Sequence, residues 1–186
     1  MKSFVCSRNR RPLEQGGASL IEVLVAILIL SFGMLSLGSM LAYAVQLPKL
    51  AGYRAMAATL ATSHIERMRS NITGFTNGDY IENLSYDASI DLPDLADCAY
   101  PDCTTASLAA MDTAYTNQAL RRELPAGGMR VERDTAAGAT DGNLWIIWNE
   151  PTTFASLNPT NSDNCPTQVA VYTDPKPRCL YIRFKL

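Results

Sequence analysis

The chain divides into one long uncharged stretch and a following region of shorter alternating patterns. No charged side chain occurs from Val23 to Pro48, a stretch of 26 residues that extends about 39 Å as a helix. Since the hydrocarbon core of a bilayer is roughly 30 Å thick, the stretch is long enough to cross it. The pattern therefore predicts a membrane-spanning helix near the N-terminus.

After Pro48 the pattern becomes that of an amphipathic helix. Pro48 lies inside one continuous pattern, so it is expected to kink the helix without ending it. The pattern stops at Asn71, and Gly74 behind it is typical of a helix end. One helix is therefore predicted over residues 18 to about 70. The side expected to be buried carries a residue every three or four positions: Leu50, Tyr53, Ala57, Leu60, His64 and Met68.

The remaining sequence predicts a loop, a second helix and a small sheet. Residues 75–104 are loop-like, and residues 105–124 have the period of a helix, which Pro125 and the glycines behind it end. Asp141-Gly142 is the expected turn between the first two strands. A long helix covering an antiparallel sheet of about four strands is an α+β fold. The predicted strands are residues 129–133, 144–150, 169–173 and 180–186.

The residues in front of the uncharged stretch form the most specific pattern of the chain. Glu22 is the one acid between Gly16 and Leu30 and lies five residues after Gly17. A carboxylate at the start of a membrane segment is costly, so a segment that keeps one usually has a use for it. The pattern is preceded by a basic N-terminus with Lys2, Arg8, Arg10 and Arg11.

The segment Gly17-Ala18-Ser19-Leu20-Ile21-Glu22-Val23 resembles the class III signal of type IV pilins and of the pseudopilins of type II secretion. The resemblance implies that a prepilin peptidase cleaves between Gly17 and Ala18 and methylates the new amine of Ala18. It also implies that Glu22, at the fifth position of the mature chain, acts in filament assembly. Cleavage after Gly16 would place Glu22 at the sixth position and is the less favoured register. The implied fold is pilin-like, again a long helix on an antiparallel sheet.

Glu22 has a physical use after such a cleavage. Ala18 then carries a cationic amine one helical turn away, and methylation keeps its charge. Glu22 is able to pair with this amine or, when helices pack side by side, with the amine of a neighbour. A mismatched register leaves both charges unpaired in an apolar medium, which costs several kcal/mol per ion. Glu22 is therefore expected to fix the register of assembly.

Two simpler explanations of the N-terminal segment, a secretory signal peptide and a plain membrane anchor, explain fewer of its features than the pilin resemblance does. A secretory signal peptide fits the small residues of Ala42-Tyr43-Ala44, but its apolar core spans about 7 to 15 residues and needs no acid. A simple membrane anchor explains the basic N-terminus, which stays in the cytoplasm. It does not explain the spacing of Gly17 and Glu22.

A second resemblance covers the amphipathic half of the helix, from Arg54 to its end. This segment closes with Glu66-Arg67-Met68-Arg69-Ser70-Asn71 and is similar to the corresponding helix of the PilV-type minor pilins. It implies a minor pilin that is incorporated at or near the tip of a type IV pilus and helps to initiate its assembly, for twitching motility or adhesion. The implied partners are the prepilin peptidase, other minor pilins and the major pilin. Before assembly, the implied location is the inner membrane, with one membrane pass and a periplasmic C-terminal domain. The alternatives are a minor pseudopilin of a type II secretion system and a membrane-anchored periplasmic binding domain.

The resemblance divides the chain into four parts. They are a leader of residues 1–17, a transmembrane and assembly half of the helix at 18–48, an amphipathic half at 49–71, and a globular domain at 72–186. The leader carries four of the 16 basic residues and one of the 18 acidic ones, which leaves 12 and 17 and a net charge of −5. No basic stripe remains for nucleic acid.

Four cysteines lie in the part that the resemblance implies is periplasmic, namely Cys98, Cys103, Cys165 and Cys179. Disulfides are expected in that compartment, and four cysteines permit three connectivities. The pairs Cys98–Cys103 and Cys165–Cys179 are favoured because each brackets a short, turn-rich segment. A zinc site is not favoured, because the spacings are not those of zinc ligands.

No catalytic motif is found in the chain. His64, the one histidine, lies on the predicted sheet-facing side and is expected to be a packed core residue. Trp145 and Trp148 fall on opposite sides of a predicted strand, so one is expected in the core and the other is a candidate contact surface. The acids between residues 87 and 102 lack the spacing of an ordered calcium loop. The chain is expected to be a substrate of enzymes rather than an enzyme, without a cofactor.

Overall fold

The computed structural model describes residues 17, 19–86, 98, 101–134, 139–150, 163–173 and 176–186. The chain divides into two units, Met1–Ala44 and Val45–Leu186, and helix α1, Leu20–Ser70, supplies residues to both. In the first unit the described residues are almost entirely helical. The second unit contains the remaining helices and a sheet.

Helix α1 confirms the long helix predicted from the sequence. Pro48 lies inside it, and the helix continues through this residue to Ser70. Proline removes one backbone donor from the helix and crowds the preceding turn, yet α1 is unbroken from Leu20 to Ser70. The buried residues of α1 all follow Pro48: Leu50, Ala57, Ala61, His64, Ile65 and Met68.

A short helix, α2 (Ile72–Asn77), follows α1 where the sequence predicts a loop from Phe75 onward. Asn71 ends the first helix and starts the second, because its side chain accepts a hydrogen bond from the Gly74 amide. Gly78 then closes α2 in the left-handed conformation, with a φ of 92°. The stop at Asn71 is therefore correct, and the loop assignment of Phe75 to Asn77 is wrong.

Helix α3 (Thr105–Glu123) agrees with the second predicted helix to within one residue. Thr104 and Ser107 form a reciprocal capping box at its start, in which each side chain accepts the backbone amide of the other. Arg121 and Arg122 lie in its last turn, where cations suit the helix dipole.

The sheet consists of three antiparallel strands, β1 (Gly128–Arg133), β2 (Asp141–Trp148) and β3 (Arg178–Lys185), in the order β1-β2-β3. The long helix packed on a small antiparallel sheet gives the predicted α+β fold. The prediction of about four strands is corrected to three in the part of the chain that the structure describes. The segment predicted as the third strand forms instead the short 3-10 helix η3, Thr167–Val171, which follows Pro166.

The turn predicted at Asp141-Gly142 is also wrong, because both residues belong to β2. Gly142 pairs with Arg133 on one side and with Phe184 on the other. A Cβ atom at Gly142 would lie only 2.7 Å from the Phe184 ring and 2.8 Å from the Glu132 carbonyl oxygen. The glycine therefore serves the close approach of the Phe184 ring rather than a turn.

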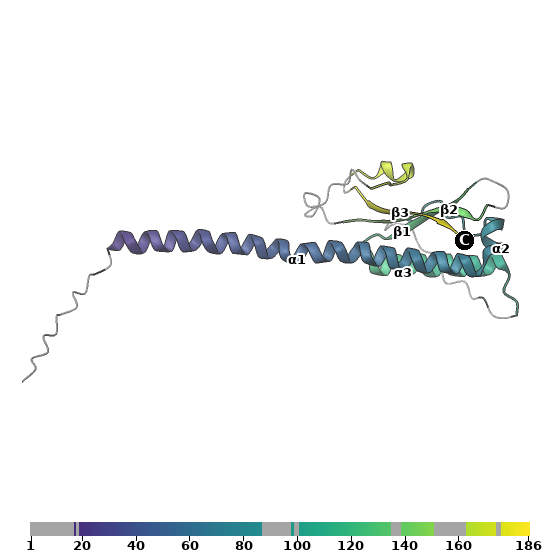
Figure 1. The fold of residues 1–186 in the computed structure, drawn as a ribbon, viewed down its shortest axis with the longest axis horizontal. Coiled ribbons are helices and arrows are strands. Elements are labelled where there is room, and N and C mark those ends of the chain that lie inside the picture. The colour runs from purple at the N-terminus through teal and green to yellow at the C-terminus, as the bar shows by residue number, and fades with distance from the viewer. Residues whose placement is uncertain are drawn as a thin grey trace, which may run out of the picture. The chain divides into compact units, whose positions relative to one another are not determined.

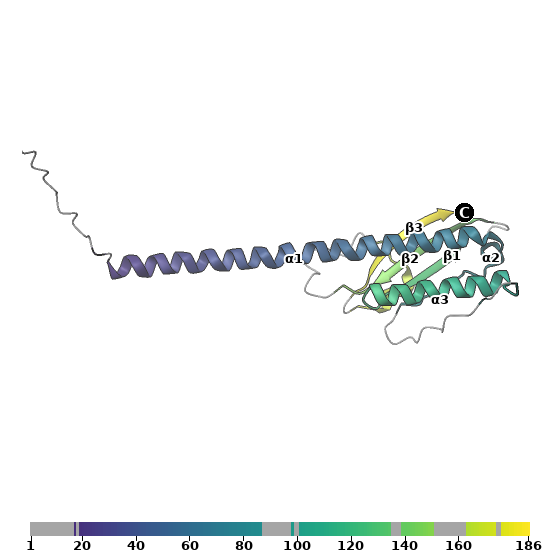
Figure 2. The same cartoon turned by 90° about the horizontal axis from the view of Figure 1, so that it is seen from below.

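In the second unit, α3 runs beside the later part of α1, and both helices lie on one side of the sheet (Figures 1 and 2). Leu144 and Ile146 of β2 and Phe184 of β3 pack towards these helices. Ile147 and Cys179, with the opposite side-chain direction, form a smaller cluster with Tyr86 and Val169 on the other face. The main core comprises Ala57, Ala61, Ile65, Met68, Phe75, Tyr80, Ala109, Leu120, Leu124, Met129, Val131, Leu144, Ile146, Trp148 and Phe184.

Candidate assembly segment and polar contacts of the globular unit

The start of α1 carries the residues of the predicted processing and assembly signal. The Ser19 carbonyl accepts the amides of Glu22 at 2.9 Å and Val23 at 3.2 Å, which begins the helix. Glu22 is exposed in the first helical turn, where the positive end of the helix dipole favours a carboxylate. Gly17 is exposed, with no atom within 4 Å of a Cβ built on it. Ala18 lies outside the described residues, so cleavage, methylation and the pairing of Glu22 stay predictions.

The uncharged half of α1 is long and apolar enough to cross a membrane. The hydroxyl groups of Ser31 and Ser39 donate to the carbonyl oxygens of Ile27 and Ser36 within the same helix. These polar groups therefore need no water, which suits a hydrocarbon environment. None of the large apolar side chains of this half is buried: Leu20, Ile21, Val23, Leu24, Val25, Ile27, Leu28, Ile29, Leu30, Phe32, Met34, Leu35, Leu37, Met40, Leu41, Val45 and Leu47.

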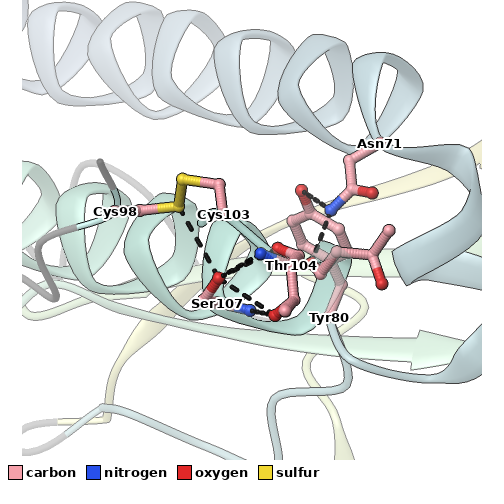
Figure 3. The surroundings of a disulfide bond; sticks show 7 residues. Asn71, Tyr80, Cys98, Cys103, Thr104 and Ser107 are labelled. Carbon is pink, nitrogen blue, oxygen red and sulfur yellow. Dashed lines mark hydrogen bonds between the residues drawn. A yellow bond between two sulfur atoms is a disulfide. The ribbon is translucent and has the colours of Figure 1, made fainter. Parts of the chain in front are cut away.

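Asn71 connects the end of α1 to two other parts of the globular unit. Its Nδ2 donates to the Tyr80 hydroxyl at 3.2 Å and to the Thr105 carbonyl at 2.8 Å. Figure 3 shows the Asn71 amide directed towards the Tyr80 hydroxyl, near the capping box at the start of α3. One side chain thus fixes α1, α2 and α3 together, a role beyond the helix end that the sequence predicts.

Asp112 is a buried carboxylate of α3 that bonds to residues from two other segments. Its Oδ2 accepts the Tyr80 hydroxyl at 2.7 Å, and its Oδ1 accepts Arg67 Nη1 of α1 at 3.1 Å. Burial, followed by the hydrogen bond to Asp112, raises the pKa of Tyr80. Arg67 also lies over the Tyr115 ring, 4.3 Å from its centroid. These contacts fasten α3 to α1 through charge-assisted hydrogen bonds.

His64 is completely buried, as expected of a packed residue, and its hydrogen bond goes to α3. Its Nδ1 lies 2.9 Å from Thr116 Oγ1, whose own proton is donated to the Asp112 carbonyl at 2.8 Å. Nδ1 must therefore carry the hydrogen and donate it to Thr116. Nε2 has no hydrogen-bond partner among the described residues. Protonation of His64 would bury an unpaired charge, so burial lowers its pKa to about 4, against the opposing charge of Asp112.

Acid is expected to destabilise the folded chain through His64. Its pKa falls from 6.5 in the unfolded state to about 4 in the folded state. Between these values only the unfolded state binds the proton, so stability present above pH 6.5 is lost as the pH falls towards 4. The free energy of unfolding is expected to drop by about 3 kcal/mol over this interval. Chemical unfolding of the full chain in detergent measures it, with His64→Gln as the control. Equal pH dependence in both proteins would contradict the prediction.

The structure contains two disulfides, Cys98–Cys103 and Cys165–Cys179, the pairs that the sequence favours. The first closes the residues directly before α3, and Cys98 Sγ lies 3.6 Å from Ser107 Oγ of the capping box (Figure 3). The second joins the residues before η3 to the second residue of β3. The first disulfide therefore lies just before the N-cap of α3, and the second ties an irregular segment to the start of β3.

A buried ionic cluster lies beside the Cys165–Cys179 disulfide, and the sequence does not predict it. The Arg178 side chain is 2% exposed, and its Nε and Nη2 lie 2.7 and 3.1 Å from the two carboxylate oxygens of Asp163. Arg178 Nε also lies 3.9 Å from Glu150, which accepts the Trp148 indole N–H at 3.3 Å. Arg54 of α1 approaches Asp163 to 3.9 Å. The sequence holds no signal for this cluster, because Arg54, Glu150, Asp163 and Arg178 lie far apart along the chain.

The two tryptophans of β2 lie as the sequence predicts. Trp148 is buried in the main core, whereas Trp145 is partly exposed on the opposite face. The Trp145 indole donates to the Asn164 carbonyl at 2.8 Å, and its ring lies 5.2 Å from that of Tyr181. Tyr181 in turn donates to Asn143 at 2.8 Å. This outer face is therefore aromatic and polar rather than purely apolar.

Within the described residues, no three His, Cys, Asp or Glu side chains form a group that could hold a metal ion. Of the acids considered for calcium, Asp102 is exposed, and those between residues 87 and 97 lie outside the described residues. Comparison of the chain with models of protein families, with curated proteins and with solved structures finds no match. The functional interpretation therefore rests on the residues and contacts of the chain itself.

Proposed function

We propose that this chain is a minor pilin of the PilV type, which is incorporated into a type IV pilus and helps to initiate its assembly. The observation that carries the proposal is the five-residue spacing from Gly17 to Glu22, directly before an uncharged helix. The continuation of that helix into a half packed on a small antiparallel sheet supports it. The chain acts in this role as a structural subunit and as a substrate of the prepilin peptidase.

The proposed mechanism has three stages. The peptidase first cuts the Gly17–Ala18 bond and methylates the amine of Ala18. Glu22 then pairs with the amine of a neighbouring subunit, which sets the axial register of the two helices. The globular domain finally offers a specific lateral face to the other minor pilins and the major pilin. The lone acid and the absence of any other charge up to Pro48 support the second stage, because an ion left unpaired in an apolar medium is costly.

The proposed location before assembly is the inner membrane, with the basic N-terminus in the cytoplasm and the domain from residue 72 in the periplasm. The excess of Lys and Arg ahead of the apolar helix supports this orientation. The two disulfides support an oxidising compartment for the C-terminal domain.

Deletion of this chain is expected to abolish surface pili while leaving protein secretion normal. The measurement is the yield of sheared pili and the amount of secreted exoproteins in the same cells, with the wild-type chain supplied in trans as the control. Normal pili with failed secretion would identify a minor pseudopilin of type II secretion instead. Normal pili with normal secretion would contradict assembly altogether and leave the membrane-anchored binding domain.

A further inference from the structure

One peptide bond of α1, between Ala44 and Val45, follows two small side chains. Ala42 and Ala44 occupy the third and the first position before this bond. Peptidases that remove secretory signal peptides cut after small residues in this arrangement. Both alanines are exposed, and so are Tyr43 between them and Val45 behind them, at 51% and 67%. The bond therefore lies in an unpacked part of the helix with the side chains that such a peptidase accepts.

Pro48 removes the usual helix hydrogen bond of the carbonyl in this bond. In an α-helix the carbonyl of each residue accepts the amide of the residue four positions later. The residue four positions after Ala44 is Pro48, which has no amide hydrogen and whose ring crowds that same carbonyl. Since Pro48 is the one proline of α1, only the Ala44 carbonyl loses its donor in this way. The carbonyl that a peptidase would attack is thus already without its helix partner.

Local opening of α1 around this bond breaks no packing of the core. Residues 39–49 include no buried side chain, and the first buried residue of the helix is Leu50, which is 5% exposed. Segments with few buried apolar contacts open at the lowest free energy. An extended peptide, which a binding cleft recognises through its main chain, is therefore accessible here without unfolding the rest of the chain.

The bond also falls at the depth of a membrane surface. About 20 helical residues span the hydrocarbon core of a bilayer. Counted from Val23, which follows Glu22, such a span ends near Ala42, and Lys49 is the next charged residue. The Ala44–Val45 bond is therefore expected just beyond the core. The basic residues before the helix stay in the cytoplasm, so this surface is the periplasmic one, an orientation that the inference takes from the proposed function.

We propose that a peptidase at the periplasmic surface of the membrane hydrolyses the Ala44–Val45 bond and releases the globular unit as a soluble fragment. The oxygen of one water molecule bonds to the Ala44 carbonyl carbon, the C–N bond breaks, and both water protons end on the Val45 nitrogen. The products are a carboxylate on the membrane helix and a new N-terminal amine. The chain divides into its two units at this bond, so the fragment keeps both disulfides and every buried residue of α1.

This cleavage would withdraw subunits from assembly, because it separates Glu22 from the globular unit. The uncharged run of 26 residues is longer than the apolar core of about 7 to 15 residues in a signal peptide. The cut is therefore expected to be slow compared with insertion into the membrane. It acts on subunits that stay unassembled and differs in position and consequence from the cut between Gly17 and Ala18.

The first test compares Ala44→Leu with Tyr43→Leu in the full chain in its own cells. Leucine and alanine both favour a helix, so Ala44→Leu keeps α1 and enlarges only the side chain before the bond. Tyr43→Leu is the matched control, because the middle position needs no small residue. After pulse labelling, the periplasmic fragment that begins at Val45 should be about tenfold or more lower in Ala44→Leu than in the control. N-terminal sequencing of the fragment identifies the bond that was cut.

The second test examines the proline. Pro48→Ala returns an amide to the Ala44 carbonyl, so release should fall about fivefold, the worth of about one backbone hydrogen bond. Leu47→Ala is the control, because the neighbouring residue is also exposed and already has an amide. Release from this control should equal that from the wild-type chain. An unchanged yield in Pro48→Ala would overturn the role of the proline.

Equal yields from Ala44→Leu and Tyr43→Leu, or a fragment that begins at another residue, would overturn the cleavage. Should no fragment accumulate in wild-type cells, washed membranes that contain the full chain decide instead, because soluble proteases that would degrade the fragment are then absent. A chain that stays intact in these membranes would likewise overturn it.

This outcome is separable from that of the proposed function. If deletion of the chain abolishes pili but Ala44→Leu and Tyr43→Leu release equal amounts, the minor-pilin proposal stands and the cleavage fails. If deletion leaves pili intact, the pilin proposal fails, and the ratio of the two variants still decides whether Ala44–Val45 is cut.

Discussion

Replacing Glu22 with alanine is expected to exclude the subunit from filaments while leaving its insertion into the membrane intact. Glu22 is exposed in the first turn of α1 and is the one charged residue of this helix up to Pro48, without a partner there among the described residues. Without its carboxylate, the cationic amine of a neighbouring subunit stays unpaired in an apolar medium. An unpaired ion costs several kcal/mol, so incorporation should fall by about a hundredfold or more.

The measurement is the ratio of the chain in sheared filaments to the chain in the membrane fraction, with leader cleavage followed by gel mobility. Glu22→Gln, which keeps the shape and removes the charge, is expected to behave like Glu22→Ala. Ser31→Ala is a matched control in the same helix, because the Ser31 hydroxyl only bonds back to the Ile27 carbonyl. Normal incorporation of both Glu22 variants would contradict the role of Glu22 in assembly, whereas absence of the wild-type chain itself from sheared filaments would identify a simple anchor.

Replacing Arg178 with methionine is expected to lower the free energy of unfolding by about 3 to 5 kcal/mol, the cost of breaking a buried ion pair. The guanidinium is almost inaccessible and contacts both carboxylate oxygens of Asp163, with Glu150 beside it. Without Arg178, the carboxylates of Asp163 and Glu150, with side chains 8% and 6% exposed, keep among the described residues only one cation nearby, the partly exposed Arg54. Methionine preserves much of the volume, so lost charge rather than a cavity dominates the effect.

Unfolding of the full chain in detergent, followed by tryptophan fluorescence, measures this loss, since Trp148 donates to Glu150 of the cluster. Arg183→Met is the control on the same strand, because its side chain is 66% exposed and makes one ion pair of 3.3 Å. Arg183→Met should change the free energy of unfolding by less than about 0.5 kcal/mol. Adding Asp163→Asn to Arg178→Met should restore part of the stability. A loss in Arg178→Met no larger than in Arg183→Met would refute the role of the cluster.

The elements that the sequence predicts well are those with an unambiguous period. The alternation of β3 places Leu180, Ile182 and Phe184 towards the core and Tyr181 and Arg183 outward, as observed. The amphipathic half of α1 likewise gives its buried side. In each case the local pattern and the packing of the fold agree, which makes sequence reasoning reliable.

The failures have two physical causes. Residues 169–173 have the composition of a strand, but Pro166 and the Cys165–Cys179 disulfide hold this short segment across the outer face, where it coils as η3. Gly142 has the appearance of a turn residue, but it serves contact with the Phe184 ring. The Arg178 cluster consists of residues that only the fold brings together, so no local sequence pattern predicts it.

The contact between Arg69 and Lys185 joins residues separated by 116 positions. The buried side of α1 packs on side chains of the last strand, so the core cannot close until the C-terminus of the chain has been made. At about 5 to 20 residues per second, this leaves the amphipathic half of α1 without its sheet for about 6 to 23 s. During that time the apolar side of α1 is exposed to other hydrophobic surfaces, because Asp112 and β3, which contact this helix in the folded chain, are synthesised later. Successful maturation of this protein therefore depends on how its early helix is kept from unwanted association before its last strand emerges.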